Sequence, residues 1–344
     1  MGLFATTRHT EQAHEAATLE AEPPTSAAVD MSVDLAGARL PSPMMTASGC
    51  AANGRELARF LDITELGAFV TKSVMADPRS GRGTPRMAET PSGMLNSIGL
   101  QGPGITAFVE KDLAWLKQAG ARVLVSIAGN TSVEFADVAG VLRDSEAFDA
   151  VAGVEVNISC PNVANRGLVF ACDPVASAAV VSLVRERLPR DVPVFAKLTP
   201  DVTDIVQVAQ ACVEAGADGL TMINTLLGMV IDTDRLRPQV AGVTGGLSGP
   251  AVRPVAVRAV WQTRAAMLEG RLPTVPVIGV GGVRTGRDAL ELVAAGASAV
   301  QVGTATFNDP SAPVRVGREL RDLLHQKGFE RLTDAVGVAH ERIA

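Results

Sequence analysis

The chain has 344 residues and a formal net charge of −6, and only 3% of its residues are aromatic, with no tyrosine. A tyrosine acid or base is therefore excluded, and the negative charge with few aromatic side chains argues against a nucleic-acid-binding protein. Hydrophobic residues make up 47% of the chain, which is ample for a globular core. No uninterrupted apolar run reaches the roughly 18 residues of a membrane span, so we expect no contact with a bilayer.

The first thirty residues differ in composition from the rest. They are rich in Ala and Glu, carry charges throughout, and lack the apolar run of a secretory signal. We expect residues 1–30 to form a polar, flexible extension and residues 31–344 to form one domain.

Short apolar runs then alternate with longer segments of helical periodicity. Runs of this kind are typical of parallel strands that are buried on both faces. The predicted strands are 44–47, 68–72, 123–127, 154–158, 194–198, 220–223, 276–280 and 299–302. The predicted helices are 54–61, 106–118, 133–141, 174–187, 205–214, 252–268, 287–294 and 313–324. Eight such units predict an α/β fold of the closed (β/α)8 TIM barrel type, in preference to an open doubly wound sheet.

A long insertion, residues 77–103, follows the second predicted strand and contains several Pro and Gly residues. Loops of this length in a compact domain are usually functional or disordered. Because barrel active sites lie at the carboxyl ends of the strands, we expect the insertion to lie beside the site.

Polar residues stand where four of the predicted strands end. They are Lys72, Asn157, Lys197 and Asn224. Any one of them is as readily explained as a residue where a strand meets solvent. Four at the same end of a barrel indicate a site, since their side chains would share one mouth.

Glycines follow the last two predicted strands, at Gly281, Gly282 and Gly303, and Thr304 comes next. Glycine lets backbone N–H groups approach an anion, and the loops after strands seven and eight are the usual phosphate site of this fold. The glycine spacing does not fit a Rossmann fingerprint. We therefore expect a ligand that carries a phosphate.

The four cysteines differ in their surroundings, and none forms a C-x-x-C pair, which favours a reducing, cytoplasmic compartment. Cys212 and Cys172 are expected to be small buried side chains. Cys160, between Asn157 and Asn162, follows a strand in a polar mouth, where a nearby Lys72 would favour the thiolate that a base requires. The four histidines all lie in the terminal regions, so no metal site is expected.

Six motifs together resemble the class 1 dihydroorotate dehydrogenases, and most closely the NAD-linked 1B branch, over about residues 32–325. The motifs are Thr46-Ala-Ser-Gly, Thr71-Lys-Ser, Glu89-Thr-Pro-Ser-Gly-Met-Leu-Asn-Ser-Ile-Gly-Leu-Gln, Asn157-Ile-Ser-Cys-Pro-Asn, Met222-Ile-Asn-Thr-Leu-Leu-Gly-Met and Thr244-Gly-Gly-Leu-Ser-Gly-Pro. The combination is far more specific than any one motif.

The resemblance implies roles for individual residues. FMN would be held by Ser48, Lys72, Ser73, Ser126, Asn157, Lys197, Ile223, Gly249, Gly281, Gly282, Gly303 and Thr304. Substrate would be held by Lys72, Asn96, Ser97, Ile98, Gly99, Leu100, Asn157, Asn162, Asn224 and Thr225. Ser126 stands where the family often has a flavin-contacting asparagine, so a hydroxyl would take the place of that amide.

The implied reaction is the oxidation of dihydroorotate to orotate in pyrimidine synthesis. Cys160 would remove a proton from C5 while hydride leaves C6 for the flavin. From Gly167 and the position of the segment after Cys160, we expect residues 164–168 to form a lid that excludes water. The resemblance also implies a homodimeric core and a separate subunit with FAD and an iron–sulfur cluster that passes electrons to NAD; fumarate or another acceptor stays open. The alternatives are a dihydropyrimidine or dihydrouracil oxidoreductase on the same scaffold, and a non-catalytic barrel that binds a phosphate ligand.

Overall fold

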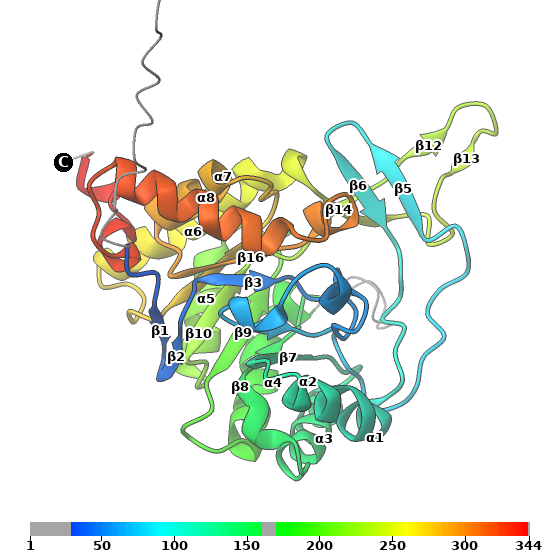
Figure 1. The fold of residues 1–344 in the computed structure, drawn as a ribbon. Helices are drawn as coiled ribbons and strands as arrows, with labels where there is room; N and C mark the ends of the chain where they lie inside the picture. Colours follow the sequence, from blue (N-terminus) through cyan, green and yellow to red (C-terminus); the bar gives the residue numbers. More distant parts are fainter. Residues whose placement is uncertain (1–28, 160–169, 343–344) are drawn as a thin grey trace, which may run out of the picture.

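The computed structural model describes residues 29–159 and 170–342, and eight parallel strands form its centre (Figure 1). In chain order they are β3 (Met44–Thr46), β4 (Phe69–Val70), β7 (Val123–Ile127), β8 (Val151–Val156), β9 (Val194–Leu198), β10 (Gly219–Met222), β15 (Val277–Val280) and β16 (Ala299–Val302). From β4 to β16 each strand pairs with the next strand of the set, and β16 pairs with β3. The predicted barrel is confirmed.

The barrel is closed between its first two strands, β3 and β4. A parallel bridge joins Met45 to Ala68. The hydroxyl of Thr46 donates to the carbonyl oxygen of Val70 at 3.1 Å and accepts from the Val70 N–H at 2.8 Å. A side chain thus replaces part of the backbone ladder where β4 is only two residues long.

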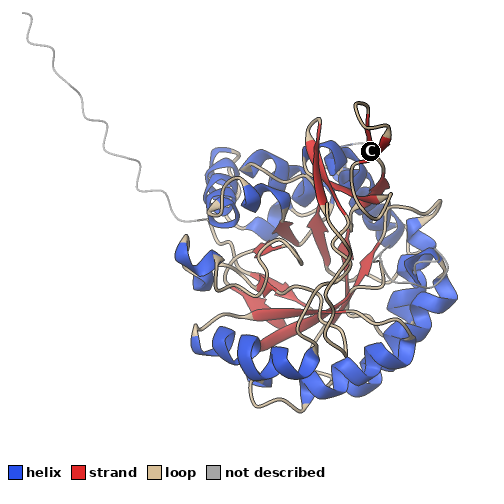
Figure 2. Ribbon diagram, turned by 90° about the vertical axis from the view of Figure 1, so that its right-hand side faces the viewer, coloured by secondary structure: helices blue, strands red, loops and turns tan. Residues whose placement is uncertain are grey.

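Helices surround the strands on the outside of the barrel (Figure 2). They are α1 (Ile105–Ala107), α2 (Ala114–Gln118), α3 (Ser132–Arg143), α4 (Pro174–Arg187), α5 (Ile205–Glu214), α6 (Arg253–Leu268), α7 (Gly286–Ala295) and α8 (Ala312–Gln326). A π-helical stretch, Phe108–Leu113, joins α1 to α2, so the predicted helix 106–118 is continuous but irregular. Within the described ranges, no helix has both the length and the apolar character to cross a membrane.

One predicted helix, 54–61, is wrong. Only a 3-10 turn, Leu57–Arg59, forms there, so the first strand is not followed by an α-helix. The backbone reverses just before it, with φ of 44° at Ala52 and 97° at Gly54. These left-handed conformations interrupt the helix that the apolar spacing predicted.

A second, antiparallel sheet stands at the carboxyl end of the barrel. It contains β5 (Met87–Thr90) and β6 (Gly93–Asn96), which come from the insertion, and β11 (Leu226–Gly228) and β14 (Gly245–Ser248), which follow β10. The β5–β6 hairpin projects beside β12 (Ile231–Asp232) and β13 (Arg237–Pro238) in Figure 1. The short hairpin of β1 (Val33–Leu35) and β2 (Ala38–Leu40) precedes the barrel. These strands were not predicted.

Candidate active site

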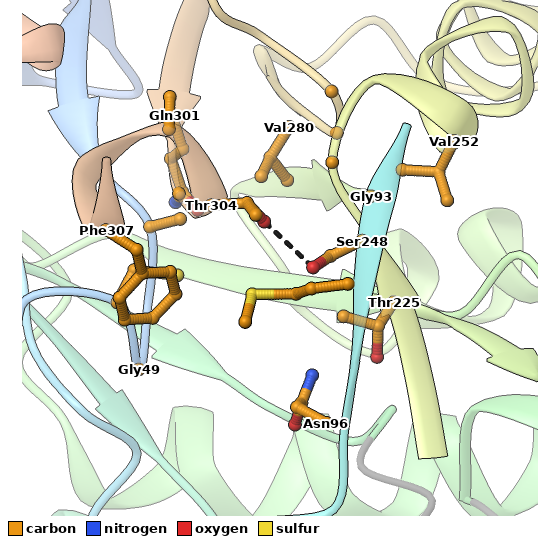
Figure 3. A pocket seen from close by; sticks show the side chains of 18 of the residues that line it. Gly49, Gly93, Asn96, Thr225, Ser248, Val252, Val280, Gln301, Thr304 and Phe307 are labelled. Carbon is orange, nitrogen blue, oxygen red and sulfur yellow. Dashed lines mark hydrogen bonds between the residues drawn. The ribbon is translucent and has the colours of Figure 1, made fainter. Parts of the chain in front are cut away.

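A cavity of about 800 Å³ opens at the carboxyl end of the barrel, between the strands and the antiparallel sheet (Figure 3). Its volume lies in the range of small-molecule and cofactor sites. The walls come from the loops after β3, β4, β15 and β16, from the ends of β8, β9 and β10, and from β6 and β14. As expected from the barrel fold, the site collects residues that are far apart in the sequence.

The four polar residues at the strand ends meet in this cavity, as predicted. Lys72, Asn157, Lys197 and Asn224 all line it. Gly49 makes room for one of the two lysines, because a Cβ at Gly49 would lie 3.2 Å from Lys72 Nζ. Two cationic side chains and two amides in one cavity favour an anionic ligand with several hydrogen-bonding groups.

Hydrogen bonds between serines and asparagines fix one wall of the cavity. Asn157 Nδ2 donates to Ser73 Oγ at 2.8 Å, and Ser73 Oγ is also 3.1 Å from Ser48 Oγ. Ser159 Oγ donates to Asn157 Oδ1 at 3.1 Å, and Asn224 Nδ2 donates to the Ser159 carbonyl oxygen at 3.0 Å. The orientation of both asparagine amides is therefore set before any ligand binds.

The glycines after β15 and β16 form a second wall. Gly281, Gly282 and Gly303 line the cavity beside Thr304. A Cβ at Gly282 would lie 2.6 Å from Arg253 Cβ, and one at Gly281 would lie 2.8 Å from Ala256 Cβ. The backbone here packs against helix α6 more closely than any side chain would allow, so only glycine fits at these two positions.

The antiparallel sheet supplies the third wall. Asn96, Thr225 and Ser248 face the cavity in Figure 3, where Thr304 Oγ1 donates to Ser248 Oγ at 2.8 Å. Asn96 Nδ2 donates to the Gly246 carbonyl oxygen at 3.2 Å, next to the backbone pairing of Asn96 with Gly246. The insertion 77–103 therefore lies beside the site, as expected, but as a paired hairpin.

Most residues that the resemblance assigned to ligands line the cavity. They are Ser48, Lys72, Ser73, Asn96, Ile98, Gly99, Leu100, Asn157, Lys197, Ile223, Asn224, Thr225, Gly249, Gly281, Gly282, Gly303 and Thr304. Ser97 and Ser126 do not line it; both are fully buried. Cys160, Asn162 and the expected lid 164–168 lie outside the described residues. The ligand contacts themselves stay predictions.

Two buried polar residues at the cavity were missed by sequence reasoning. Gln301, on β16, lines the cavity, and Glu155, on β8, lies behind it. Glu155 Oε1 accepts from Lys197 Nζ at 3.1 Å, and Glu155 Oε2 accepts from Gln301 Nε2 at 2.9 Å. A charged residue inside an apolar strand is rarely buried without a partner, and this was the available signal.

The described cysteines divide differently from the expectation. Cys212 is fully buried, as predicted, and burial raises the pKa of its thiol to about 12. Cys172 is exposed, and its predicted burial is wrong: it ends a short 3-10 turn, Phe170–Cys172, before α4. Cys50 lines the cavity, where burial raises the pKa of its thiol although Lys197 and Lys72 act in the opposite direction.

Comparison with known proteins agrees with this geometry. The family model described as "Dihydroorotate dehydrogenase" matches residues 30–324. A protein of Geobacter sp. strain M21, named "Dihydroorotate dehydrogenase B (NAD(+)), catalytic subunit", is 49% identical over 308 residues, which cover 90% of this chain and 97% of that protein.

Two proteins of the same name are similarly close. The one from Citrifermentans bemidjiense is 49% identical, and the one from Geobacter sulfurreducens is 48% identical, both over 90% of this chain and 97% of their own length. A family match over most of the chain and this level of identity agree with the closed barrel and its polar cavity. The chain therefore belongs to the dihydroorotate dehydrogenase family.

Proposed function

We propose that the chain is the catalytic subunit of an FMN-dependent dihydroorotate dehydrogenase, which oxidises (S)-dihydroorotate to orotate in pyrimidine biosynthesis. The observation that carries this proposal is the convergence of Lys72, Asn157, Lys197 and Asn224 with the glycine wall in one cavity of a family member. In this proposal the glycine wall binds the phosphate of FMN, and the polar residues at the strand ends bind the small polar substrate ring.

The cavity suits FMN. Gly281, Gly282 and Gly303 line one wall of the cavity, where their backbone N–H groups would bind the phosphate, and Thr304 adds a hydroxyl beside them. The volume of about 800 Å³ has room for a flavin and a small substrate together. When bound, FMN supplies the acceptor for the hydride that leaves C6 of dihydroorotate.

The asparagines and Lys72 suit the substrate. Dihydroorotate carries one carboxylate and an imide-type edge with alternating donors and acceptors, and each asparagine amide offers one donor and one acceptor group. Asn157 and Asn224 are held by the hydrogen bonds through Ser73 and Ser159, so they lose little freedom when the ring binds. Lys72 adds a positive charge to the cavity that contains both asparagines.

Cys160 is the proposed base that removes the C5 proton. It lies outside the described residues, but Ser159, immediately before it, is tied to Asn157 and Asn224. These two asparagines are the proposed ligands of the substrate ring, and Cys160 follows Ser159 directly in the sequence. Asn162 is proposed as a further substrate ligand, and the Ser126 contact with FMN stays a proposal.

The electrons then leave the reduced cofactor. The similar proteins are named catalytic subunits of an NAD(+)-linked enzyme. By this likeness we propose a homodimeric core that associates with a separate FAD and iron–sulfur subunit and reduces NAD in the cytoplasm. Residues 1–30 are proposed as an extension outside the barrel domain 31–344.

The test is an anaerobic visible spectrum of the purified protein before and after addition of dihydroorotate. A flavin band near ~450 nm that bleaches on addition supports cofactor, substrate and half-reaction together. Dihydrouracil, which lacks the carboxylate, serves as the matched control and should leave the band unchanged. Bleaching by dihydrouracil alone would favour a dihydropyrimidine oxidoreductase, and a protein that takes up no FMN would overturn the proposal.

A further inference from the structure

Glu155 places a carboxylate in the interior of the barrel, where apolar side chains usually fill the space. Its side chain has no exposed surface, and both oxygens are occupied. Oε1 accepts from Lys197 Nζ at 3.1 Å and from Ser126 Oγ at 3.2 Å, and Oε2 accepts from Gln301 Nε2 at 2.9 Å. The carboxylate thus links β8 to β7, β9 and β16.

Such an arrangement is costly in a barrel interior. A buried ion pair often contributes less to stability than apolar residues of the same volume. The surrounding strand, Val151–Val156, is otherwise apolar and would accept such a residue. The pair is therefore better explained by what it does for the cavity than by stability.

Two of the three partners of Glu155 reach the cavity, and Glu155 itself does not. Lys197 and Gln301 line the cavity, whereas Glu155 lies behind them. Because Gln301 Nε2 is bound to Glu155, the amide cannot turn over, and its Oε1 stays an acceptor with no partner among the described residues. A buried acceptor without a partner is costly unless a ligand N–H meets it. The imide N–H of a flavin ring is such a donor.

We propose that Glu155 is a positioning residue for the cofactor, which fixes the Lys197 ammonium and the Gln301 amide at the cavity wall in the orientation that FMN requires. This inference rests on the proposed function, since it takes FMN as the ligand. In this proposal Glu155 does not contact FMN itself. It holds Lys197 and Gln301, which do. Ser126, through its hydrogen bond to Glu155, belongs to the same support.

The test is a double-mutant cycle on FMN affinity, measured by quenching of flavin fluorescence as apoprotein is added. E155Q keeps the size of the side chain and removes its charge, so we expect FMN to bind about 10- to 100-fold more weakly. In a K197M background the same change should weaken FMN binding by a smaller factor, because the contact with Lys197 is already lost and only the contact of Glu155 with Gln301 is altered. E65Q, which removes the surface carboxylate paired with Arg318, is the control and should bind FMN normally.

A merely structural carboxylate would behave differently. Its replacement would give the same loss of FMN affinity with and without Lys197, and that result would overturn the proposal. A dissociation constant of FMN from E155Q within about twofold of the wild-type value would overturn it as well. The visible absorption maximum of FMN bound to E155Q should also differ from that of FMN bound to wild type. The reason is that the wavelength of this maximum depends on charges near the flavin ring.

A third variant keeps the proposal testable if E155Q does not fold. E155D retains the charge but withdraws the carboxylate by one methylene, so it should still weaken FMN binding at least about fivefold; normal binding would overturn the positioning role. Failure of the two proposals is distinguishable. A wild-type chain that takes up no FMN removes both, whereas wild-type bleaching by dihydroorotate with unaltered FMN affinity in the Glu155 variants removes only this one.

Discussion

Thr304 Oγ1 donates a hydrogen bond to Ser248 Oγ at 2.8 Å, and this bond joins two sheets (Figure 3). Thr304 follows barrel strand β16, whereas Ser248 ends β14 of the antiparallel sheet. Both residues line the cavity, next to Gly249 and Gly303. The phosphate end of the proposed FMN site is therefore formed by the barrel and by the added sheet together.

We expect T304V to weaken FMN binding by about tenfold. Valine matches threonine in shape but leaves Ser248 without this donor and removes a hydroxyl from the phosphate wall. The dissociation constant of FMN from the variant is the measurement. Thr333, exposed in a turn near the C-terminus, gives the control T333V, which should bind FMN as wild type does. Equal affinity of T304V and wild type would remove Thr304 from the FMN site.

A second prediction concerns Gly282, whose φ is +74°. A Cβ there would lie 2.6 Å from Arg253 Cβ and 2.9 Å from the Gly249 carbonyl oxygen. G282A should lower the free energy of unfolding by roughly 1–3 kcal/mol and shift the glycine wall enough to impair FMN uptake.

The matched control for this change is G140A. Gly140 lies within helix α3 and has open space around its Cβ position, so alanine should leave the stability unchanged or raise it by up to about 1 kcal/mol. Chemical denaturation of both variants and wild type measures the difference. A stable G282A with full FMN content would show that the close approach at this position is not needed.

The barrel and the lining of its cavity could be predicted because they depend on local patterns. Short apolar runs mark the strands, and residues at their carboxyl ends, such as Asn157 and Asn224, meet by the geometry of the fold. The helix at 54–61 could not be rejected from its apolar spacing, since the reversal at Ala52 is a backbone conformation that this residue type rarely adopts.

The antiparallel sheet was missed for a different reason. Its strands β5 and β6 are close in the sequence, but β14, which pairs with β6, comes about 150 residues later. No local pattern in the insertion indicates a contact at that sequence separation. The hydrogen bonds around Glu155 were missed because each links residues that only the closed barrel brings together, although a glutamate in an apolar strand was a signal.

Reactivity of the cysteines offers a third prediction. Burial raises the pKa of the Cys50 thiol, so at neutral pH it is protonated and a poor nucleophile. Iodoacetamide at pH 7.5 should modify exposed Cys172 faster than Cys50, as read by peptide mass spectrometry. The sign follows from the shift: raising the pH above 9 should accelerate Cys50 modification, and FMN should protect it because Cys50 lines the cavity. Rapid labelling of Cys50 at neutral pH would contradict this assignment.

The last prediction concerns the proposed base. Because Cys160 would act only on the C5 proton, C160A should purify with its FMN band intact. Reduction of that FMN by dihydroorotate should be slower by roughly 10²- to 10⁴-fold, the usual contribution of a positioned base. Stopped-flow absorbance under anaerobic conditions measures the rate.

The control for loss of a thiol as such is C172A, because Cys172 is exposed and does not line the cavity. Its rate should equal that of wild type. If C160A is also reduced at the wild-type rate, Cys160 is not the base, whereas a C160A protein without FMN would assign the residue to cofactor binding. A slow rate with full FMN content is the result that separates proton removal from cofactor binding, since the proposed substrate ligands Asn157 and Asn224 are unchanged in this variant.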